Sequence, residues 1–253
     1  MAPLKGQYLL IIGGSSGMGF STAKLALAAG ANVAIASSSS NKVQDAVSRL
    51  GGPNGGGTSG QVSGHVVDLA GADPDAALER LFTDVTQGGR QPLDHIINTA
   101  GRGVPIPISE IDMASASNLA RLPLFVPLLI GKLAPRFLNP GPNSSIIFTS
   151  GQVAEKPIPG YSVLAAFASA QHGLARNLAV DLAPIRVNVV APGPTETEMW
   201  GDQRDVIKEI VVGQSLLGKT ASPDEVAEAY IYLIKNTDAT GSIVSSNGGV
   251  TLK

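Results

Sequence analysis

The stretch Tyr8-Leu-Leu-Ile-Ile-Gly-Gly-Ser-Ser-Gly-Met-Gly19 decides the fold. Apolar residues typical of a buried strand run into a glycine-rich turn, and helical periodicity follows over residues 18–29. Glycine lets the backbone turn tightly and approach a phosphate, and a helix N-terminus offers free N–H groups and a positive dipole end. We therefore predict a dinucleotide-binding loop; a plain tight turn is the weaker alternative. The expected cofactor contacts are Gly13, Ser15, Ser16, Gly17, Met18 and Gly19.

Short apolar runs alternate with longer segments of helical period along the rest of the chain. The predicted strands are 8–12, 32–36, 65–67, 94–97, 145–148 and 185–190. The predicted helices are 18–29, 42–50, 74–85, 114–138, 163–182 and 223–235. Strands that are apolar on successive residues are covered on both faces, and this alternation implies crossover connections in a parallel sheet. No repeat or composition shift divides the chain, so we predict one α/β domain over residues 1–253.

The composition argues against several classes of function. The chain has 253 residues, a formal net charge of −2 and no cysteine. Without a basic run, nucleic acid and anionic membranes are poor partners, and without cysteine there is no thiolate catalysis or zinc–thiolate site. The N-terminal apolar run reaches glycine too soon for a signal sequence or a membrane span. We therefore expect a cytoplasmic protein that acts on a small molecule and holds no metal.

Several motifs together resemble the short-chain dehydrogenase/reductase family over nearly the whole chain. The spacing Gly-x-x-x-Gly-x-Gly at 13–19 is joined by Asp68-Leu69, by Asn98-Thr-Ala-Gly101, by Arg186-Val-Asn188 and by Ala191-Pro-Gly193 with Thr197. One departure is Ile12, where the family has threonine. The resemblance implies a single Rossmann-type, doubly wound parallel sheet of about seven strands, with the last strand inside 241–249. It also implies cofactor contacts at Asp68, Leu69, Asn98, Ala100, Gly101, Pro192, Gly193, Thr195 and Thr197.

The end of the second predicted strand bears on the choice of cofactor. An acid there would hold the ribose hydroxyl of NAD and repel the 2′-phosphate of NADP. This chain instead has Ser37, Ser38 and Ser39, with Lys42 close by, and these groups can donate to a phosphate. We predict NADP(H) as the cofactor; a merely polar loop is the alternative.

The resemblance also implies an active site, and that site is incomplete in this chain. The family uses a serine, a tyrosine, a lysine four residues after the tyrosine, and an asparagine. Ser150 and Tyr161 fit the first two, although their separation is two residues shorter than expected, so the register stays open. Ala165 stands in the place of the lysine, and Arg121 or Leu122 in the place of the asparagine.

The missing lysine favours reduction over oxidation. A tyrosine without a neighbouring cation stays protonated at neutral pH, which makes Tyr161 a poor general base but leaves it able to donate a proton. An iminium substrate needs no acid at all, only a hydride donor held in line. The runs Pro157-Ile-Pro-Gly-Tyr-Ser-Val163, 178–190 and Tyr230-Ile-Tyr-Leu233 also resemble a divergent, lysine-less fungal branch of the family. Members of that branch reduce iminium intermediates, and in some cases guide a cyclisation, in indole-alkaloid pathways.

We therefore predict an NADP(H)-dependent reductase of a bulky carbonyl or iminium metabolite. A cyclase or isomerase without net redox change, and a nucleotide-sensing protein, are the alternatives. Arg121 lies in an apolar stretch, so it is either paired or faces a wet cavity, where it could act on the substrate. Trp200 and Gln152 are candidate substrate contacts, Trp200 by stacking unless it only packs in a lid. His65, His95 and His172 are not predicted to be catalytic.

Small residues along the predicted helix 163–182 permit close approach of a second helix. They include Ala165, Ala166, Ala168, Ser169, Ala170 and Gly173. Family members usually pair through this helix and the helix that holds Arg121. The chain is therefore predicted to form a homodimer or homotetramer.

Overall fold

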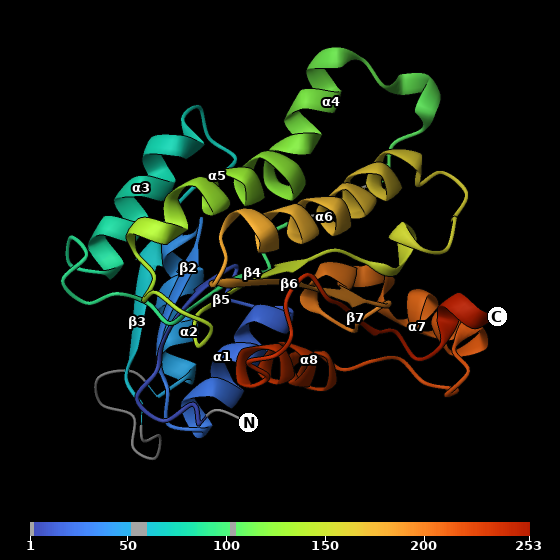
Figure 1. Ribbon diagram of the computed structural model, residues 1–253. Coiled ribbons are helices and arrows are strands. Elements are labelled where there is room, and N and C mark those ends of the chain that lie inside the picture. Colours follow the sequence, from blue (N-terminus) through green and yellow to red (C-terminus); the bar gives the residue numbers. More distant parts are fainter. Residues whose placement is uncertain (1–2, 52–59, 102–104) are drawn as a thin grey trace.

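The computed structural model of the protein describes residues 3–51, 60–101 and 105–253. Seven parallel strands form one sheet in the order β3-β2-β1-β4-β5-β6-β7 (Figure 1). The strands are β1 (Tyr8–Ile12), β2 (Asn32–Ser37), β3 (Val62–Val66), β4 (His95–Asn98), β5 (Ser145–Thr149), β6 (Arg186–Pro192) and β7 (Ile243–Ser246). The order reverses between β1 and β4, which is where open α/β sheets bind their ligands. The predicted doubly wound α/β fold is confirmed.

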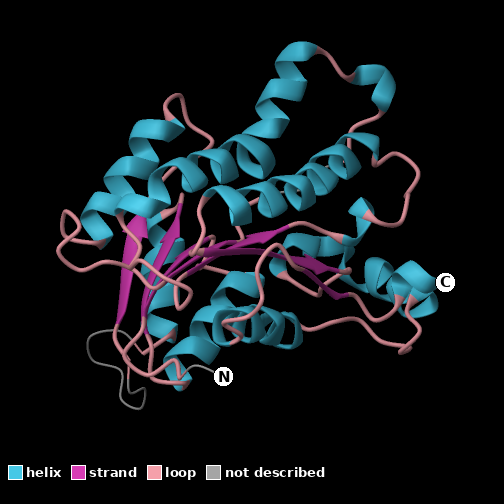
Figure 2. Cartoon of the chain, in the orientation of Figure 1, coloured by secondary structure: helices cyan, strands magenta, loops and turns pink. Residues whose placement is uncertain are grey.

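Helices cover both faces of the sheet (Figure 2). On one face lie α1 (Gly17–Ala28), α2 (Ser40–Arg49) and α8 (Pro223–Lys235), with a core that includes Leu9, Ile35 and Tyr230. On the other face lie α3 (Pro74–Val85), α5 (Val126–Leu133) and α6 (Ser162–Asp181), with a core that includes Phe82 and Phe148. Because both faces are buried, β1, β4 and β6 carry no exposed residue, as their continuous apolar runs predict.

The long helix predicted over 114–138 is divided in the structure. It begins as α4 (Met113–Ala120), widens into a π-helical turn, η2 (Arg121–Phe125), and continues as α5 and a short 3-10 turn, η3 (Ala134–Arg136). Pro123 and Pro127 explain the break, because proline has no N–H for the helical ladder and its ring clashes with the preceding turn.

Two other boundaries differ from the prediction. Strand β3 ends at Val66 and begins at Val62, three residues before the predicted start, since Ser63 and Gly64 weaken its apolar pattern. A further helix, α7 (Arg204–Gln214), follows a 3-10 segment, η5 (Glu198–Gln203), where no helix was predicted. Its residues are almost all exposed, so no buried apolar stripe marked it.

Residues Met113–Arg136 are long and apolar enough to cross a membrane by length and composition alone. The π-helical turn interrupts this run, and Val126, Ile130 and Leu133 of α5 are buried in the core on the face of the sheet that α5 covers. This contact with the sheet explains the apolar composition of the second half of the run.

Candidate active site

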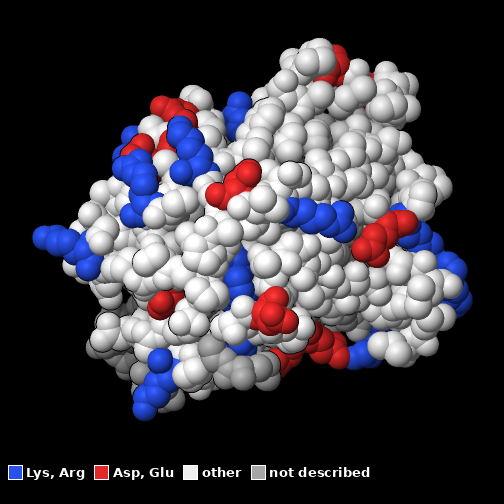
Figure 3. All heavy atoms as spheres, viewed as in Figure 1, with Lys and Arg blue, Asp and Glu red and all other residues white. Residues whose placement is uncertain are grey.

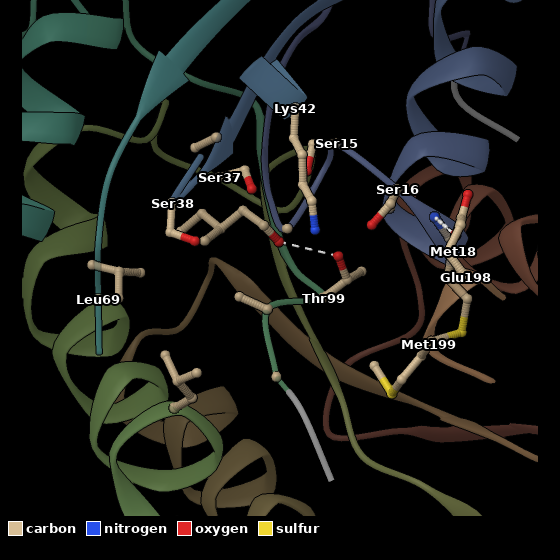
Figure 4. A pocket seen from close by; sticks show the side chains of 18 of the residues that line it. Ser15, Ser16, Met18, Ser37, Ser38, Lys42, Leu69, Thr99, Glu198 and Met199 are labelled. Carbon is tan, nitrogen blue, oxygen red and sulfur yellow. Dashed lines mark hydrogen bonds between the residues drawn. The ribbon is translucent and has the colours of Figure 1, made fainter. Parts of the chain in front are cut away.

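A cleft of about 580 Å³ lies at the carboxyl ends of the strands. Its walls come from the residues that follow β1, β2, β3 and β4, and from the segment after β6 (Figure 4). The predicted contacts that line it are Gly13, Ser15, Ser16, Gly17, Met18, Gly19, Ser37, Ser38, Asp68, Leu69, Ala100, Gly101 and Thr197. The remaining predicted contacts, described below, lie around it.

At two positions of the glycine-rich loop, Gly13 and Gly19, the structure leaves no room for a side chain. Gly13 has a φ of +87°, and a Cβ there would lie 2.6 Å from Oγ1 of Thr99. A Cβ on Gly19 would lie 2.4 Å from the carbonyl oxygen of Gly13. Glycine at both positions therefore brings the loop against the β4 turn and keeps the N-terminus of α1 open to the cleft. This shape fits a dinucleotide diphosphate.

The end of β2 forms a polar and cationic corner of the cleft. Ser37, Ser38 and Lys42 line it together with Ser15, and Lys42 extends into the same hollow (Figure 4). Among the described residues, none pairs with the Lys42 ammonium group. Ser39 has a different role, since its side chain is the N-cap acceptor for the N–H of Lys42 at 3.4 Å and it does not line the cleft. The corner therefore offers hydroxyls and one free cation to an anionic group.

The β4 turn is shaped by its own side chains. Asn98 is buried, and its Oδ1 accepts from the N–H of Ala100 at 3.2 Å. The Thr99 hydroxyl donates to the carbonyl of Ile12 at 3.1 Å, which ties the β1 and β4 ends together. Asn98 thus supports the cleft wall from behind, while Ala100 and Gly101 face the cleft.

The residues after β6 form the opposite wall. A Cβ on Gly193 would lie 2.7 Å from Cα of Asn247, so glycine allows the segment after β6 to pack closely against the segment after β7. Thr195 is buried, and its hydroxyl donates to the carbonyl of Gly193 at 3.0 Å. Thr197 faces the cleft next to Gly17. The cleft lining does not include Pro192, Gly193 or Thr195, which precede Thr197 in the chain. Their predicted contact with the cofactor stays a prediction.

Ser150 follows β5 directly, and its hydroxyl lies 2.8 Å from Nε2 of His172 on α6. Tyr161 is half-buried and is the residue that precedes α6. No hydrogen bond joins Tyr161 to Ser150 in the described part of the chain. Burial lowers the pKa of His172, the Glu155 carboxylate raises it and the Arg176 guanidinium lowers it.

The comparisons with known proteins agree with this geometry. The model of the SDR-like Rossmann domain matches residues 3–253. The chain belongs to the short-chain dehydrogenase/reductase family. The short-chain dehydrogenase/reductase ATR9 of Stachybotrys chlorohalonatus is 43% identical over 256 residues and is matched along the whole of both chains.

Solved structures extend the likeness. The structure of MalC reductase/Diels-Alderase from Malbranchea aurantiaca has a TM-score of 0.92 and 32% identity, covering 99% of this chain and 98% of that one. A small-chain dehydrogenase in complex with NADPH has a TM-score of 0.78 and 25% identity, covering 98% and 100%. Membership of the family implies a nicotinamide cofactor and a small-molecule substrate.

In this short-chain dehydrogenase/reductase, Arg121 is paired, which is one of the two alternatives expected from the sequence. Its Nη1 donates to the carbonyl oxygens of Ala70 and Gly71 at 2.5 and 2.8 Å. The guanidinium therefore joins the π-helical turn to the loop that follows β3, instead of forming a salt bridge. A direct role for Arg121 on the substrate stays a prediction.

The two predicted substrate contacts, Gln152 and Trp200, are not part of the cleft lining. Gln152 follows β5 in the short 3-10 turn η4 (Gln152–Ala154), and its Oε1 is buried without a hydrogen-bond partner in the described structure. Trp200 lies in η5, half-buried and outside the cleft lining. Across the described ranges, no group of three or more His, Asp or Glu side chains is arranged to hold a metal ion.

Sequence reasoning did not foresee two contacts, that of His172 with Ser150 and that of Glu198 with Gly17. His172 was set aside, although helical spacing places it on the same face of α6 as Ala168 and Ala175, which are both buried. Glu198 was not among the predicted site residues, but it lines the cleft and its Oε2 accepts from the N–H of Gly17 at 3.1 Å. The periodicity of α6 could have revealed the first; no local pattern could have revealed the second.

Proposed function

We propose that this protein is an NADP(H)-dependent reductase that delivers hydride to a carbonyl or iminium carbon of a bulky secondary metabolite. The corner formed by Ser15, Ser37, Ser38 and Lys42 carries the cofactor part of the proposal. It suits a 2′-phosphate, because β2 ends in hydroxyls and a nearby cation where an acid would repel that phosphate. When bound, NADPH supplies the hydride.

Residues of this chain position both the cofactor and the substrate. The loop of residues 13–19 and the N-terminus of α1 take the diphosphate, and Asp68 and Leu69 border the adenine side. Beyond the β4 turn, Ser150 and Tyr161 supply hydroxyl groups near the place where the substrate oxygen would lie. The alanine at position 165 favours reduction, because it gives the phenol no lysine ammonium group that would help it to act as a base. Trp200 and Gln152 are the proposed substrate contacts.

A second function is a cyclisation guided by the same cleft without net redox change. A specific observation favours keeping it: the MalC structure, with 32% identity over 99% of this chain, is described as a reductase and a Diels-Alderase. A shaped, partly apolar cleft can bind a reactive intermediate in one conformation whether or not hydride is transferred.

Hydride transfer can be tested with NADPH deuterated at C4 and two probes, 9,10-phenanthrenequinone and the N-methyl-3,4-dihydroisoquinolinium ion. We expect NADPH to be consumed in an amount equal to the product of at least one probe. Deuterium should be retained at C1 of the reduced isoquinolinium, whereas the quinone product loses it on enolising to the aromatic diol, so quinone reduction is followed by the diol formed without oxygen. No transfer to either probe would count against the reductase. Conversion of a diene substrate to a product of equal mass, without loss of NADPH, would favour the cyclase.

A further inference from the structure

Ser150 is held at the end of β5 by two contacts. Its N–H donates to the carbonyl of Val190 on β6 at 2.9 Å, and its hydroxyl meets Nε2 of His172 at 2.8 Å. The pair therefore joins the carboxyl end of β5 to the middle of α6. Both side chains are half-buried, so the pair is neither sealed in the core nor fully in solvent.

The position of the pair follows from the order of the sheet. The cleft passes the ends of β3, β2, β1 and β4 in that spatial order, and the next strand along the sheet is β5. Ser150 is the first residue after β5, and the Thr149 hydroxyl before it donates to the carbonyl of Asn98 in β4 at 2.8 Å. A ligand that extends along the cleft past the β4 turn thus meets Ser150 next.

A comparison with His95 shows why the pair is suited to chemistry. His95 is fully buried, both of its ring nitrogens have partners, and burial lowers its pKa to about 3, so it is a packed core residue. His172 is half-buried and bonds only through Nε2; in the described structure its Nδ1 has no partner. An imidazole with one nitrogen on a hydroxyl and the other free can pass a proton along its ring.

We propose that Ser150 and His172 form a proton relay that serves the substrate oxygen during carbonyl reduction, in place of the tyrosine–lysine arrangement this chain lacks. The inference rests on the proposed reductase function. As the carbonyl carbon gains hydride, the Ser150 hydroxyl gives its proton to the oxygen. Ser150 takes the Nε2 proton of His172, and Nδ1 takes one from water, which leaves as hydroxide into the solvent. The substrate gains one hydride and one proton, and the relay returns to its starting composition with the ring proton on the other nitrogen.

The charges around His172 are consistent with a neutral resting imidazole. Burial lowers its pKa below 6.5, the Glu155 carboxylate raises it and the Arg176 guanidinium lowers it. Charged groups on other elements packed against α6 are engaged elsewhere. Arg121 of η2 bonds to carbonyls 70 and 71, and Lys132 of α5 pairs with Asp75. Arg186 of β6 bonds to carbonyls near the end of α8.

The kinetic test compares His172→Ala with His65→Ala on the two probes above. His65 is a matched control, because its Nε2 also meets a serine hydroxyl, Ser63, at 3.2 Å, but on the edge strand β3. We expect His172→Ala to lower quinone reduction at least about tenfold more than iminium reduction, because only the carbonyl oxygen needs a proton. Added imidazole should restore part of the lost rate, and His65→Ala should leave both rates within twofold.

The pH profile and NMR supply readouts that a purely structural role would not move. Since imidazolium is the stronger acid, wild-type quinone reduction should rise as pH falls through the pKa of His172, below 6.5, and this rise should vanish in His172→Ala. In the free protein, the ¹⁵N shifts of His172 should show Nε2 bonded, and Ser150→Ala should change its tautomer balance and pKa. Equal losses on both probes without imidazole rescue, or an unchanged profile, would overturn the relay. Wild-type protein inactive on both probes would instead overturn the reductase itself.

Discussion

The backbone N–H of Gly17 donates to Oε2 of Glu198 at 3.1 Å, which joins the N-terminus of α1 to the segment after β6 (Figure 4). A side-chain carboxylate thus lies at the dipole end that the diphosphate of a dinucleotide would use. Met199, next in the chain, is exposed and borders the same cleft. The contact therefore couples the position of η5 to the N-terminus of α1, where the cofactor diphosphate is expected to bind.

We expect Glu198→Gln to bind NADPH more tightly, because the variant no longer places a like charge beside the diphosphate. A charge near a helix end is worth up to about 1 kcal/mol, so the dissociation constant should fall about fivefold. Fluorescence titration at low salt measures it, and the difference should shrink as salt screens the charge. Glu209→Gln, on the exposed surface of α7, is the control; an equal gain there would mean a general charge effect.

Lys42 should decide the preference for NADPH over NADH, which we expect to be at least tenfold in the wild type. A hydrogen bond to a charged group contributes about 1.5–3 kcal/mol, so Lys42→Ala should weaken NADPH binding at least about tenfold. NADH lacks the 2′-phosphate, so its affinity should change less than twofold. Isothermal titration of both cofactors measures the two effects, with Lys24→Ala, an exposed lysine paired with Asp224, as the control. Equal losses for both cofactors would place Lys42 away from the phosphate.

The sheet and its cofactor edge were predictable because their signals are local. A buried parallel strand shows itself as an apolar run, and the glycines at 13 and 19 stand where a Cβ would meet neighbouring backbone. The break at Arg121–Phe125 was also present in the sequence as Pro123 and Pro127, but the long apolar pattern outweighed it. Helix α7 had no such signal, because it buries only Val211.

Contacts between distant residues were not predictable in the same way. Ser150 and His172 lie 22 residues apart, and Gly17 and Glu198 lie 181 apart. Each pair depends on how a loop meets a helix in three dimensions, which no spacing rule for one element describes. Arg121 shows the same limit: the sequence required a partner for its charge, and the structure supplies the carbonyls of Ala70 and Gly71.

Arg121→Ala should destabilise the protein and weaken NADPH binding, since the loop that it holds follows Asp68 and Leu69. Loss of a charged donor to these carbonyls should cost about 2 kcal/mol of unfolding free energy. Urea unfolding checks this value, with Arg136→Ala as a control whose exposed ion pair with Glu79 should contribute less than about 1 kcal/mol. A lower kcat with unchanged stability and NADPH affinity would instead support the substrate role predicted from the sequence.

Association should depend on the apolar surface of α5 and α6. Leu128 of α5 and Val180 of α6 are exposed, as is Phe125 at the end of η2. The face shown in Figure 3 carries a broad area with few charged side chains over α4 and α6. We expect a homodimer or homotetramer, and Leu128→Glu should shift it toward monomers by placing a charge in a buried contact. Sedimentation velocity at micromolar concentration measures the shift. Val206→Glu, at another exposed apolar position, on α7, should leave the assembly unchanged.

Tyr161→Phe separates the two possible sources of the proton. The phenol has no hydrogen-bond partner in the described structure, whereas the Ser150 hydroxyl is already bonded to His172. If the relay supplies the proton and Tyr161 only adds a hydrogen bond, quinone reduction should fall less than about tenfold. If Tyr161 were the sole acid, the loss should reach about 10²–10⁴-fold. Iminium reduction should barely change in either case. Single-turnover rates with NADPH decide between them, with Tyr232→Phe on the exposed side of α8 as the control. A hundredfold loss in Tyr161→Phe, with none in His172→Ala, would transfer the acid role to Tyr161.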